Sequence, residues 1–322
     1  FRPLDAVRFV VERESLTRAD PGDASSWLLR REGSECWVRT AEASAPVRAR
    51  TTPDLPALCT RDDTAWHDAL VAAAQAIAGM RVGVGFDVLP TWVARALKRP
   101  SSPLRERAQT NAVDGLDLLG SNLAEAYFTF INEPAYKRLW PEILSTIQLG
   151  FGDQIEDVMT PAAGAGYVEL VVQLRGRRNP VPAQALSNGM LAWLSLVALV
   201  YLGREARSML VLDEPELHLH PRLLARAVQL FHATAARHPV LLATHSRRML
   251  DLLGDEAGPA TLVCTLDEAQ HAAQVQTVNT ERLRAWLEDF DGLGALADAG
   301  YLPALLDDPA PPGAQSAAEP AP

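Results

Sequence analysis

Short apolar runs alternate with helix-periodic segments along the second half of the chain. Each run is almost entirely apolar, four to seven residues long and followed by polar or turn-forming residues. The predicted strands comprise residues 208–213, 239–244 and 260–266, and the predicted helices comprise residues 186–203, 221–238 and 246–254. Apolar strands separated by helices are typical of a parallel sheet that is covered on both faces.

The first half has a different pattern. Two runs rich in Val, Trp and Leu, residues 6–16 and 25–40, predict antiparallel strands with a hairpin turn at Gly33. Helix periodicity then covers residues 64–80 and, as two helices, residues 120–148. Prolines, serines and charges predict an exposed loop over 98–115, and residues 167–177 alternate like a strand. The fold class expected is therefore α/β, with an antiparallel strand layer and a helical lobe ahead of the parallel core sheet.

Composition narrows the class of protein. The formal net charge of −10 argues against a surface that is basic all over and built to coat nucleic acid. Two short basic clusters are read as solvated faces or turns: Arg95, Lys98, Arg99, Arg105 and Arg107, and separately Arg175, Arg177 and Arg178. Three widely spaced cysteines without a CxxC pair favour neither a disulfide framework nor structural zinc. No apolar run has the length of a membrane span, so we expect a cytoplasmic protein.

Polar side chains follow two of the predicted strands directly. Asp213 and Glu214 end the run 208–213, and Thr244, His245 and Ser246 end the run 239–244. The carboxyl ends of parallel strands meet at one edge of a sheet, where ligands bind in open α/β folds. A strand-end aspartate can hold Mg²⁺ through water while the next carboxylate polarises an attacking water. The alternative is a solvated strand end without chemistry.

Three short motifs in order carry a resemblance to a known family. They are LSNGM at residues 186–190, LVLDEP at residues 210–215 and ATHS at residues 243–246. Together they resemble the ABC-type ATPase heads of the SMC/RecF-like group, and more narrowly the small bacterial AAA-type ATPases that lack a long coiled coil. The resemblance is strong over residues 187–251 and fair over residues 114–302.

The resemblance implies a function and a role for each matched residue. It implies an ATPase that binds ATP and Mg²⁺ and works as a nucleotide-sandwich homodimer, in DNA repair or phage defence, with DNA or an effector protein as partner. Asp213 would be the Walker B carboxylate for Mg²⁺, Glu214 the catalytic base and His245 the switch histidine. The signature residues Ser187, Asn188 and Gly189 would meet the γ-phosphate of ATP held by the other subunit. Residues 219–221 would face that subunit.

One expected motif is absent from the sequence. No GxxxxGK[ST] occurs, because Gly83, Gly85 and the stretch 163–167 all lack the lysine that binds phosphate. The family places this P-loop near the N-terminus, so we expect an N-terminally truncated P-loop NTPase-like head that begins at Phe1. The alternative is an ABC-like scaffold or binding module without hydrolysis. Within residues 1–304, the expected head, residues 64–165 form the helical lobe and 166–304 the core. Residues 305–322 are expected to be disordered.

Two histidines close to the acidic pair allow a third interpretation. His218 and His220 could join Asp213, Glu214 and Glu216 as a zinc site of a metal-dependent hydrolase. They point the same way only in an extended segment. The proline at position 221 favours a helix start there, with His220 near the cap. We therefore expect the histidines to face a partner subunit or solvent.

Overall fold

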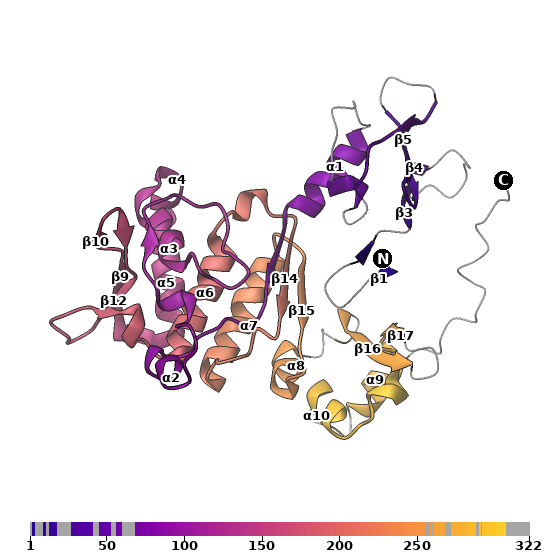
Figure 1. The fold of residues 1–322 in the computed structure, drawn as a ribbon. Coiled ribbons are helices and arrows are strands. Elements are labelled where there is room, and N and C mark those ends of the chain that lie inside the picture. The colour runs from indigo at the N-terminus through magenta and orange to yellow at the C-terminus, as the bar shows by residue number, and fades with distance from the viewer. Residues whose placement is uncertain are drawn as a thin grey trace. The chain divides into compact units, whose positions relative to one another are not determined.

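The computed structural model describes residues 2–3, 9–10, 13–17, 27–40, 45–52, 56–59, 68–254, 258, 260–267, 272–287, 290 and 292–306. These residues form two compact units (Figure 1). The first contains residues 1–81 and 203–210, and the second contains residues 82–202 and 211–322. Our division into a lobe of residues 64–165 and a core of residues 166–304 remains a prediction.

The first unit is an antiparallel sheet with one helix. Its strands follow the order β3 (Arg13–Thr17), β4 (Trp27–Glu32), β5 (Glu35–Val38) and β6 (Val47–Arg48), and a second strand pair joins β1 (Arg2–Pro3) to β2 (Phe9–Val10). Gly33 has a φ of +58° in the turn between β4 and β5, which confirms the predicted hairpin. Helix α1 (Asp68–Ala78) buries Leu70 in the same core cluster as Leu29 and Val38.

Helices dominate the second unit, and α6 (Asn188–Tyr201) lies at its centre. Every residue from position 191 to 201 is buried, so this helix is apolar on all sides. Two buried side chains donate to main-chain carbonyls across the core. Trp193 Nε1 donates to Ile147 O on α5 (Trp140–Phe151) at 3.1 Å, and Tyr127 on α3 (Leu123–Asn132) donates to Leu194 O at 3.1 Å. These bonds and the apolar packing hold α6 in a fixed orientation.

The two helices predicted over residues 120–148 are three in the structure. A short helix α4 (Pro134–Lys137) separates α3 from α5. Pro134 and Pro141 each lie in the first turn of a new helix, where the missing N–H of proline costs no intrahelical hydrogen bond. The unit also contains α2 (Thr91–Ala96).

The predicted core sheet forms around β14 (Met209–Asp213). It lies between β15 (Val240–Ala243) and β7 (Met80–Gly83), a strand that the sequence analysis did not identify. Helix α7 (Pro221–Ala235) connects β14 to its neighbour β15 and packs on β15 (Figure 1). A helical crossover between adjacent strands makes them parallel, so Asp213 and Ala243 end at the same edge.

Two further sheets of three strands each belong to this unit. One has the order β13 (Val181–Pro182), β12 (Val171–Leu174) and β9 (Ile155–Met159), and the other β10 (Ala162–Gly164), β11 (Tyr167–Val168) and β8 (Ala108–Gln109). The single strand predicted over residues 167–177 is therefore two short strands in different sheets.

The last predicted strand does not join the core sheet, which corrects our expectation for residues 260–266. β16 (Leu262–Asp267) pairs antiparallel with β17 (Ala272–Thr277), and the two form a separate sheet in the described part of the chain. With α9 (Thr280–Trp286) and α10 (Leu293–Asp298) they surround a small core that includes Leu283 and Leu296. α10 packs against α8 (Arg247–Leu253), the helix that follows β15.

The C-terminal boundary also differs from the prediction. Leu305 and Leu306 are buried, so the structured part extends past position 304. The rest of the expected tail, residues 307–322, lies outside the described residues. None of the described helices is both long enough and apolar enough to cross a bilayer.

Candidate functional site

The acidic pair occupies the end of β14, as the sequence predicts. Asp213 is exposed and Glu214 is half-buried. The Glu214 main-chain N–H donates to Ala243 O at 2.8 Å, which ties the turn after β14 to the end of β15. Glu214 has a φ of +46°, a left-handed conformation that costs a residue with a side chain about 1–2 kcal/mol. Strain of this kind persists where the surrounding structure imposes it, and it is common at functional sites.

The segment after β15 brings His245 to the same edge. His245 Nε2 lies 4.0 Å from Glu214 Oε1, and the histidine side chain is 95% exposed. The two residues are therefore neighbours, and the imidazole faces solvent. This geometry agrees with the predicted meeting of the two strand ends.

A third carboxylate, that of Glu216, supports this edge, a role that the sequence did not predict. Glu216 accepts a hydrogen bond from the Thr244 hydroxyl, and Thr244 Oγ1 in turn accepts from Ser246 N at 2.9 Å. Ser246 caps α8 by accepting from Met249 N at 3.3 Å. Glu216 Oε2 is buried and has no partner among the described residues. The turn after β14 and the segment around His245 are thus joined by side chains as well as by backbone.

Two glycines allow a loop to pack directly below the acidic pair. Gly83 and Gly85 line a small cavity with Asp213 and Glu214. A Cβ atom at Gly83 would lie 2.9 Å from Leu212 Cδ2, and one at Gly85 would lie 2.7 Å from Leu217 Cδ1. The cavity measures about 10 Å³, room for at most one water molecule. These glycines therefore serve close packing, and any ligand of the carboxylates must approach from the solvent side.

The predicted signature residues form the start of α6. Ser187 is the N-cap, and its Oγ accepts from Met190 N at 3.2 Å. Asn188 and Gly189 are half-buried. A Cβ at Gly189 would lie 3.4 Å from His218 O, so the start of α6 adjoins the turn that follows the acidic pair. The structure thus places Ser187, Asn188 and Gly189 together, and places the turn containing His218 beside them.

The two histidines of that turn have separate environments. His220 caps α7, where its Nδ1 accepts from Arg222 N at 3.3 Å, and His218 is exposed with a φ of +65°. No group of three or more His, Cys, Asp or Glu side chains could hold a metal ion in the part of the chain that the structure describes. This finding gives the zinc hydrolase interpretation no support. Asp213 alone suits Mg²⁺, which keeps several waters and binds through one or two carboxylates plus substrate phosphates.

Arg105 is a buried residue beside the signature segment, and our expectation of an exposed basic loop is wrong for it. Its side chain is 1% exposed. Nη2 donates to Asn188 Oδ1 at 2.9 Å and Nη1 donates to Leu186 O at 2.9 Å. Burial lowers the pKa of the Arg105 guanidinium, and Asp87 partly offsets this effect. No pattern in the Pro- and Ser-rich sequence around it distinguishes this arginine from its exposed neighbours.

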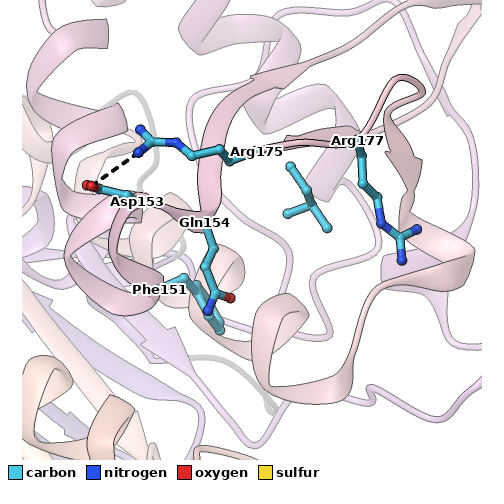
Figure 2. Close-up of a pocket in the computed structure, with 6 residues that line it drawn as sticks. Phe151, Asp153, Gln154, Arg175 and Arg177 are labelled. Carbon is cyan, nitrogen blue, oxygen red and sulfur yellow. Dashed lines mark hydrogen bonds and ion pairs between the residues drawn. The ribbon is translucent and has the colours of Figure 1, made fainter.

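A larger cavity of about 530 Å³ lies elsewhere in the second unit, near the turn after β12 (Figure 2). Its lining residues are Phe151, Asp153, Gln154, Leu174, Arg175 and Arg177. None of the predicted site residues is among them.

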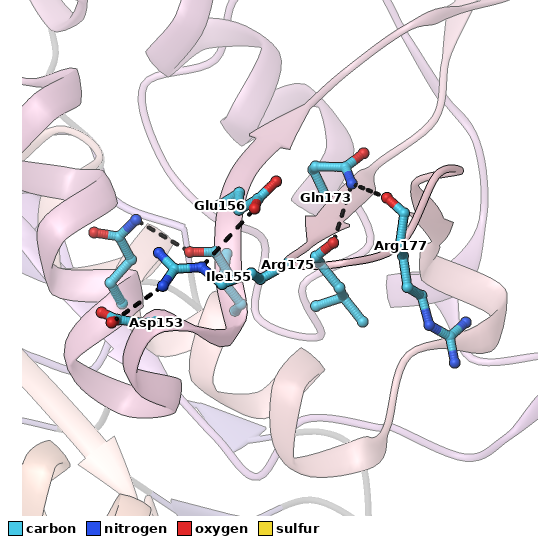
Figure 3. A network of polar contacts seen from close by, with 8 residues as sticks. Asp153, Ile155, Glu156, Gln173, Arg175 and Arg177 are labelled. Carbon is cyan, nitrogen blue, oxygen red and sulfur yellow. Dashed lines mark hydrogen bonds and ion pairs between the residues drawn. The ribbon is translucent and has the colours of Figure 1, made fainter.

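Acidic neighbours offset part of the basic cluster at this cavity (Figure 3). Arg175 pairs with Asp153 at 3.3 Å and Glu156 at 3.9 Å, while Gln173 Nε2 donates to Arg177 O at 2.6 Å. The cluster of three arginines is therefore a structured turn in which one charge is already neutralised.

Comparison with known proteins identifies the family. Residues 79–251, more than half of the chain, match the family described as "AAA domain, putative AbiEii toxin, Type IV TA system". The match covers β7, the signature segment, the acidic pair, His245 and most of α8. No curated protein matches the chain.

Several solved structures resemble this chain at low sequence identity. One is described as "Structural biochemistry of ATP-driven dimerization and DNA stimulated activation of SMC ATPases"; it is 16% identical over 48% of this chain and 94% of that chain, with a TM-score of 0.33. The Smc head domain of Pyrococcus yayanosii is 15% identical over 51% of this chain and 32% of its own, with a TM-score of 0.35. The SMC head domain from Thermotoga maritima is 19% identical over 48% and 52%, with a TM-score of 0.33.

The chain spans about a third of the Pyrococcus yayanosii structure and about half of the Thermotoga maritima structure. The family match stands without them. Over residues 79–251 it includes every residue of the candidate site, and the mixed α/β architecture agrees with it. The chain belongs to this family of AAA-type ATPase domains.

Proposed function

We propose that the chain supplies the Walker B, signature and switch-histidine parts of an ABC-type ATPase head that hydrolyses ATP. The observation that carries the proposal is the arrangement of Asp213, Glu214 and His245 at one sheet edge, with the Glu214 and His245 side chains 4.0 Å apart. A carboxylate next to a histidine on the solvent side of a strand end can take part in attack on a phosphate.

Each residue has a distinct role in this proposal. Asp213 would hold Mg²⁺ through water, and the chemistry that this ion would supply is neutralisation of charge on the phosphate. Glu214 accepts a proton from the attacking water, and its carboxylate is only half-buried, so water can reach it. His245 donates a hydrogen bond to the γ-phosphate. The contacts of Glu216 with Thr244 hold the two segments in register.

The signature residues act on the nucleotide of a second subunit in this proposal. Ser187 and Gly189 lie at the N-terminus of a 14-residue helix, where main-chain N–H groups and the helix dipole favour an anion. The turn containing His218 adjoins them, so both segments would face the partner in an ATP-bound homodimer. The dimer would open when ATP is hydrolysed.

The replacement Glu214→Gln tests the proposed base. In the protein expressed from its complete reading frame, it is expected to reduce ATP turnover by about 10²–10⁴-fold, because a neutral amide cannot accept the proton. Binding of ATP should persist, and the ATP-bound dimer should accumulate in size-exclusion chromatography. Glu205→Gln is the matched control, since the Glu205 side chain is 90% exposed and has no role in the proposed site. Unchanged turnover in Glu214→Gln would refute the assignment.

A scaffold or binding module without hydrolysis is the second candidate. The observation that favours it is the lack of GxxxxGK[ST] within residues 1–322. The same assay separates the candidates. Turnover in the wild-type protein that Glu214→Gln abolishes supports the enzyme, and no turnover with Mg·ATP in the complete protein supports the scaffold.

We also propose that opening and closing of the ATP-bound dimer acts on DNA or on an effector protein. This would take place in the cytoplasm, in DNA repair or phage defence. The family description, with its reference to a toxin system, supports an effector function. Measuring ATP turnover with and without duplex DNA tests the first partner. Stimulation by DNA would favour it, and an unchanged rate would favour a protein effector.

A further inference from the structure

Arg105 is a fully buried arginine without an ion pair among the described residues. Its side chain is 1% exposed, and its acceptors are four main-chain carbonyls and one side-chain amide. Burying a charge without an ion-paired carboxylate is costly, and the nearby charge of Asp87 offsets only part of this cost, so such a residue needs many well-placed acceptors to persist. An arginine remains protonated even when burial disfavours its charge.

Most of these acceptors lie just ahead of the signature helix. Nη1 donates to the carbonyls of Ala183 and Leu186, both at 2.9 Å, and more weakly to Gln184 O at 3.3 Å. Nη2 reaches Asn188 Oδ1 at 2.9 Å. Gln184 Nε2 returns a hydrogen bond to Arg105 O at 2.6 Å. One side chain thus fixes the path of residues 183–188.

The same guanidinium also binds the loop that passes below the acidic pair. Nη2 donates to Val88 O at 3.0 Å, and the segment just before Val88 contains Gly83 and Gly85 of the cavity under Asp213 and Glu214. Arg105 therefore connects the support of the acidic pair with the start of α6. These two regions are about 100 residues apart in the sequence.

We propose that Arg105 is a positioning residue of the proposed ATP site: it holds the signature segment in its phosphate-binding conformation and places a buried positive charge behind the N-terminus of α6. This inference rests on the proposed function. The charge adds to the helix dipole at the point where Ser187 and Gly189 would meet phosphate. Asn188 Oδ1 is turned inward to Arg105, so Asn188 transmits this constraint, and Ser187 and Gly189 are left to contact the nucleotide.

Hydrogen exchange in the nucleotide-free protein tests the positioning directly. In Arg105→Met, amides of residues 186–191 should lose roughly tenfold to a hundredfold protection, the range expected when charge-assisted hydrogen bonds are removed. Amides of α7 should keep theirs. Arg105→Lys keeps the charge but not the planar fork, so it should show an intermediate loss.

Arg107→Met is the matched control. Arg107 is two residues away, its side chain is 58% exposed, and it pairs with Glu169 at 3.6 Å. It should exchange like the wild type. Unchanged protection of residues 186–191 in Arg105→Met, or an equal loss throughout the second unit, would overturn the inference.

A double-mutant cycle with ATP turnover as readout tests the link to Asn188. Arg105→Met and Asn188→Ala should each lower kcat by more than about tenfold, and the double variant should be little worse than either, because both remove one shared contact. The KM for ATP should change less than kcat, since the signature segment acts on the nucleotide of the partner subunit. Multiplicative losses in the double variant would contradict the proposed link.

The two proposals can fail separately. If the wild-type protein hydrolyses no ATP while Arg105→Met still loosens residues 186–191 alone, the proposed function is wrong and the positioning stands. If the wild type hydrolyses ATP and Arg105→Met keeps both protection and rate, the positioning is wrong and the function stands.

Discussion

Replacing Thr244 with Val removes the side-chain link across the candidate site. The Thr244 hydroxyl donates to the Glu216 carboxylate and accepts from Ser246 N at 2.9 Å. Valine has nearly the same shape but can make neither bond. Glu216 would then lose its hydrogen-bond donor, and its buried Oε2 already lacks one in the described structure.

The cost follows from these two bonds. A hydrogen bond to a charged group contributes about 1.5–3 kcal/mol and a neutral one about 0.5–1.5 kcal/mol. Because Thr244 is half-buried, the lower parts of these ranges apply, and we expect Thr244→Val to lose about 2–3 kcal/mol of unfolding free energy. At a urea m-value of about 1–3 kcal/mol per molar, the midpoint should fall by roughly 0.7–3 M.

Urea unfolding followed by tryptophan fluorescence measures the loss, since Trp193 is fully buried in the second unit. Thr244→Ser is the control, because serine keeps the hydroxyl and loses only a methyl group. It should retain most of the stability. A Thr244→Val midpoint close to that of the wild type, or equal losses in both variants, would refute the reasoning.

Three other substitutions test the packing and electrostatics of the second unit. Gly294→Ala should destabilise by about 1–3 kcal/mol, seen as a lower Tm, because its Cβ would clash with Arg247 O and lie 2.6 Å from Asp251 Oδ1; an unchanged Tm would contradict the close approach of α10 to α8. Tyr127→Phe should cost about 1 kcal/mol in thermal unfolding, because the Leu194 carbonyl of α6 loses its buried side-chain donor, and equal stability would mean that this bond contributes nothing. Burial raises the pKa of Glu125 above its usual value, so the folded state binds the proton more tightly than the unfolded state and stability falls as pH rises through that range. Glu125→Gln should therefore raise the Tm at pH 7.5 and give no gain at pH values below the usual carboxyl range, and a gain of equal size at both would refute this cause.

Local sequence signals were sufficient for the core elements of the site. The apolar run before Asp213 predicted β14 to within one residue, and the helix-periodic run predicted the start of α7 at Pro221, although the helix ends at Ala235, three residues before the predicted end. Helix periodicity predicted a helix over residues 186–203, and the structure has α6 there, with Ser187 as its N-cap. Such features depend on neighbours within a few residues, and so a local sequence pattern can predict them.

Other elements were not predicted, or were assigned to the wrong sheet, because their sequence patterns are weak or resemble those of loops. β7 is short and glycine-containing, so it reads as a turn, and its strand character depends on pairing with β14. The run at 260–266 has a clear strand pattern, yet the pattern does not specify its partner. The hairpin with β17 satisfies its main-chain groups as well as the core sheet would.

The sequence by itself determined that Asp213 and Glu214 end one apolar run, that His245 follows another, and that a helix precedes them. Only the tertiary structure decided that Glu216 binds Thr244 and that Arg105 is buried against the signature segment. Thr244 lies 28 residues from Glu216, and Asn188 lies 83 residues from Arg105. An arginine in a polar loop looks the same whether exposed or buried, because its burial depends on carbonyl acceptors that distant segments supply when the chain folds.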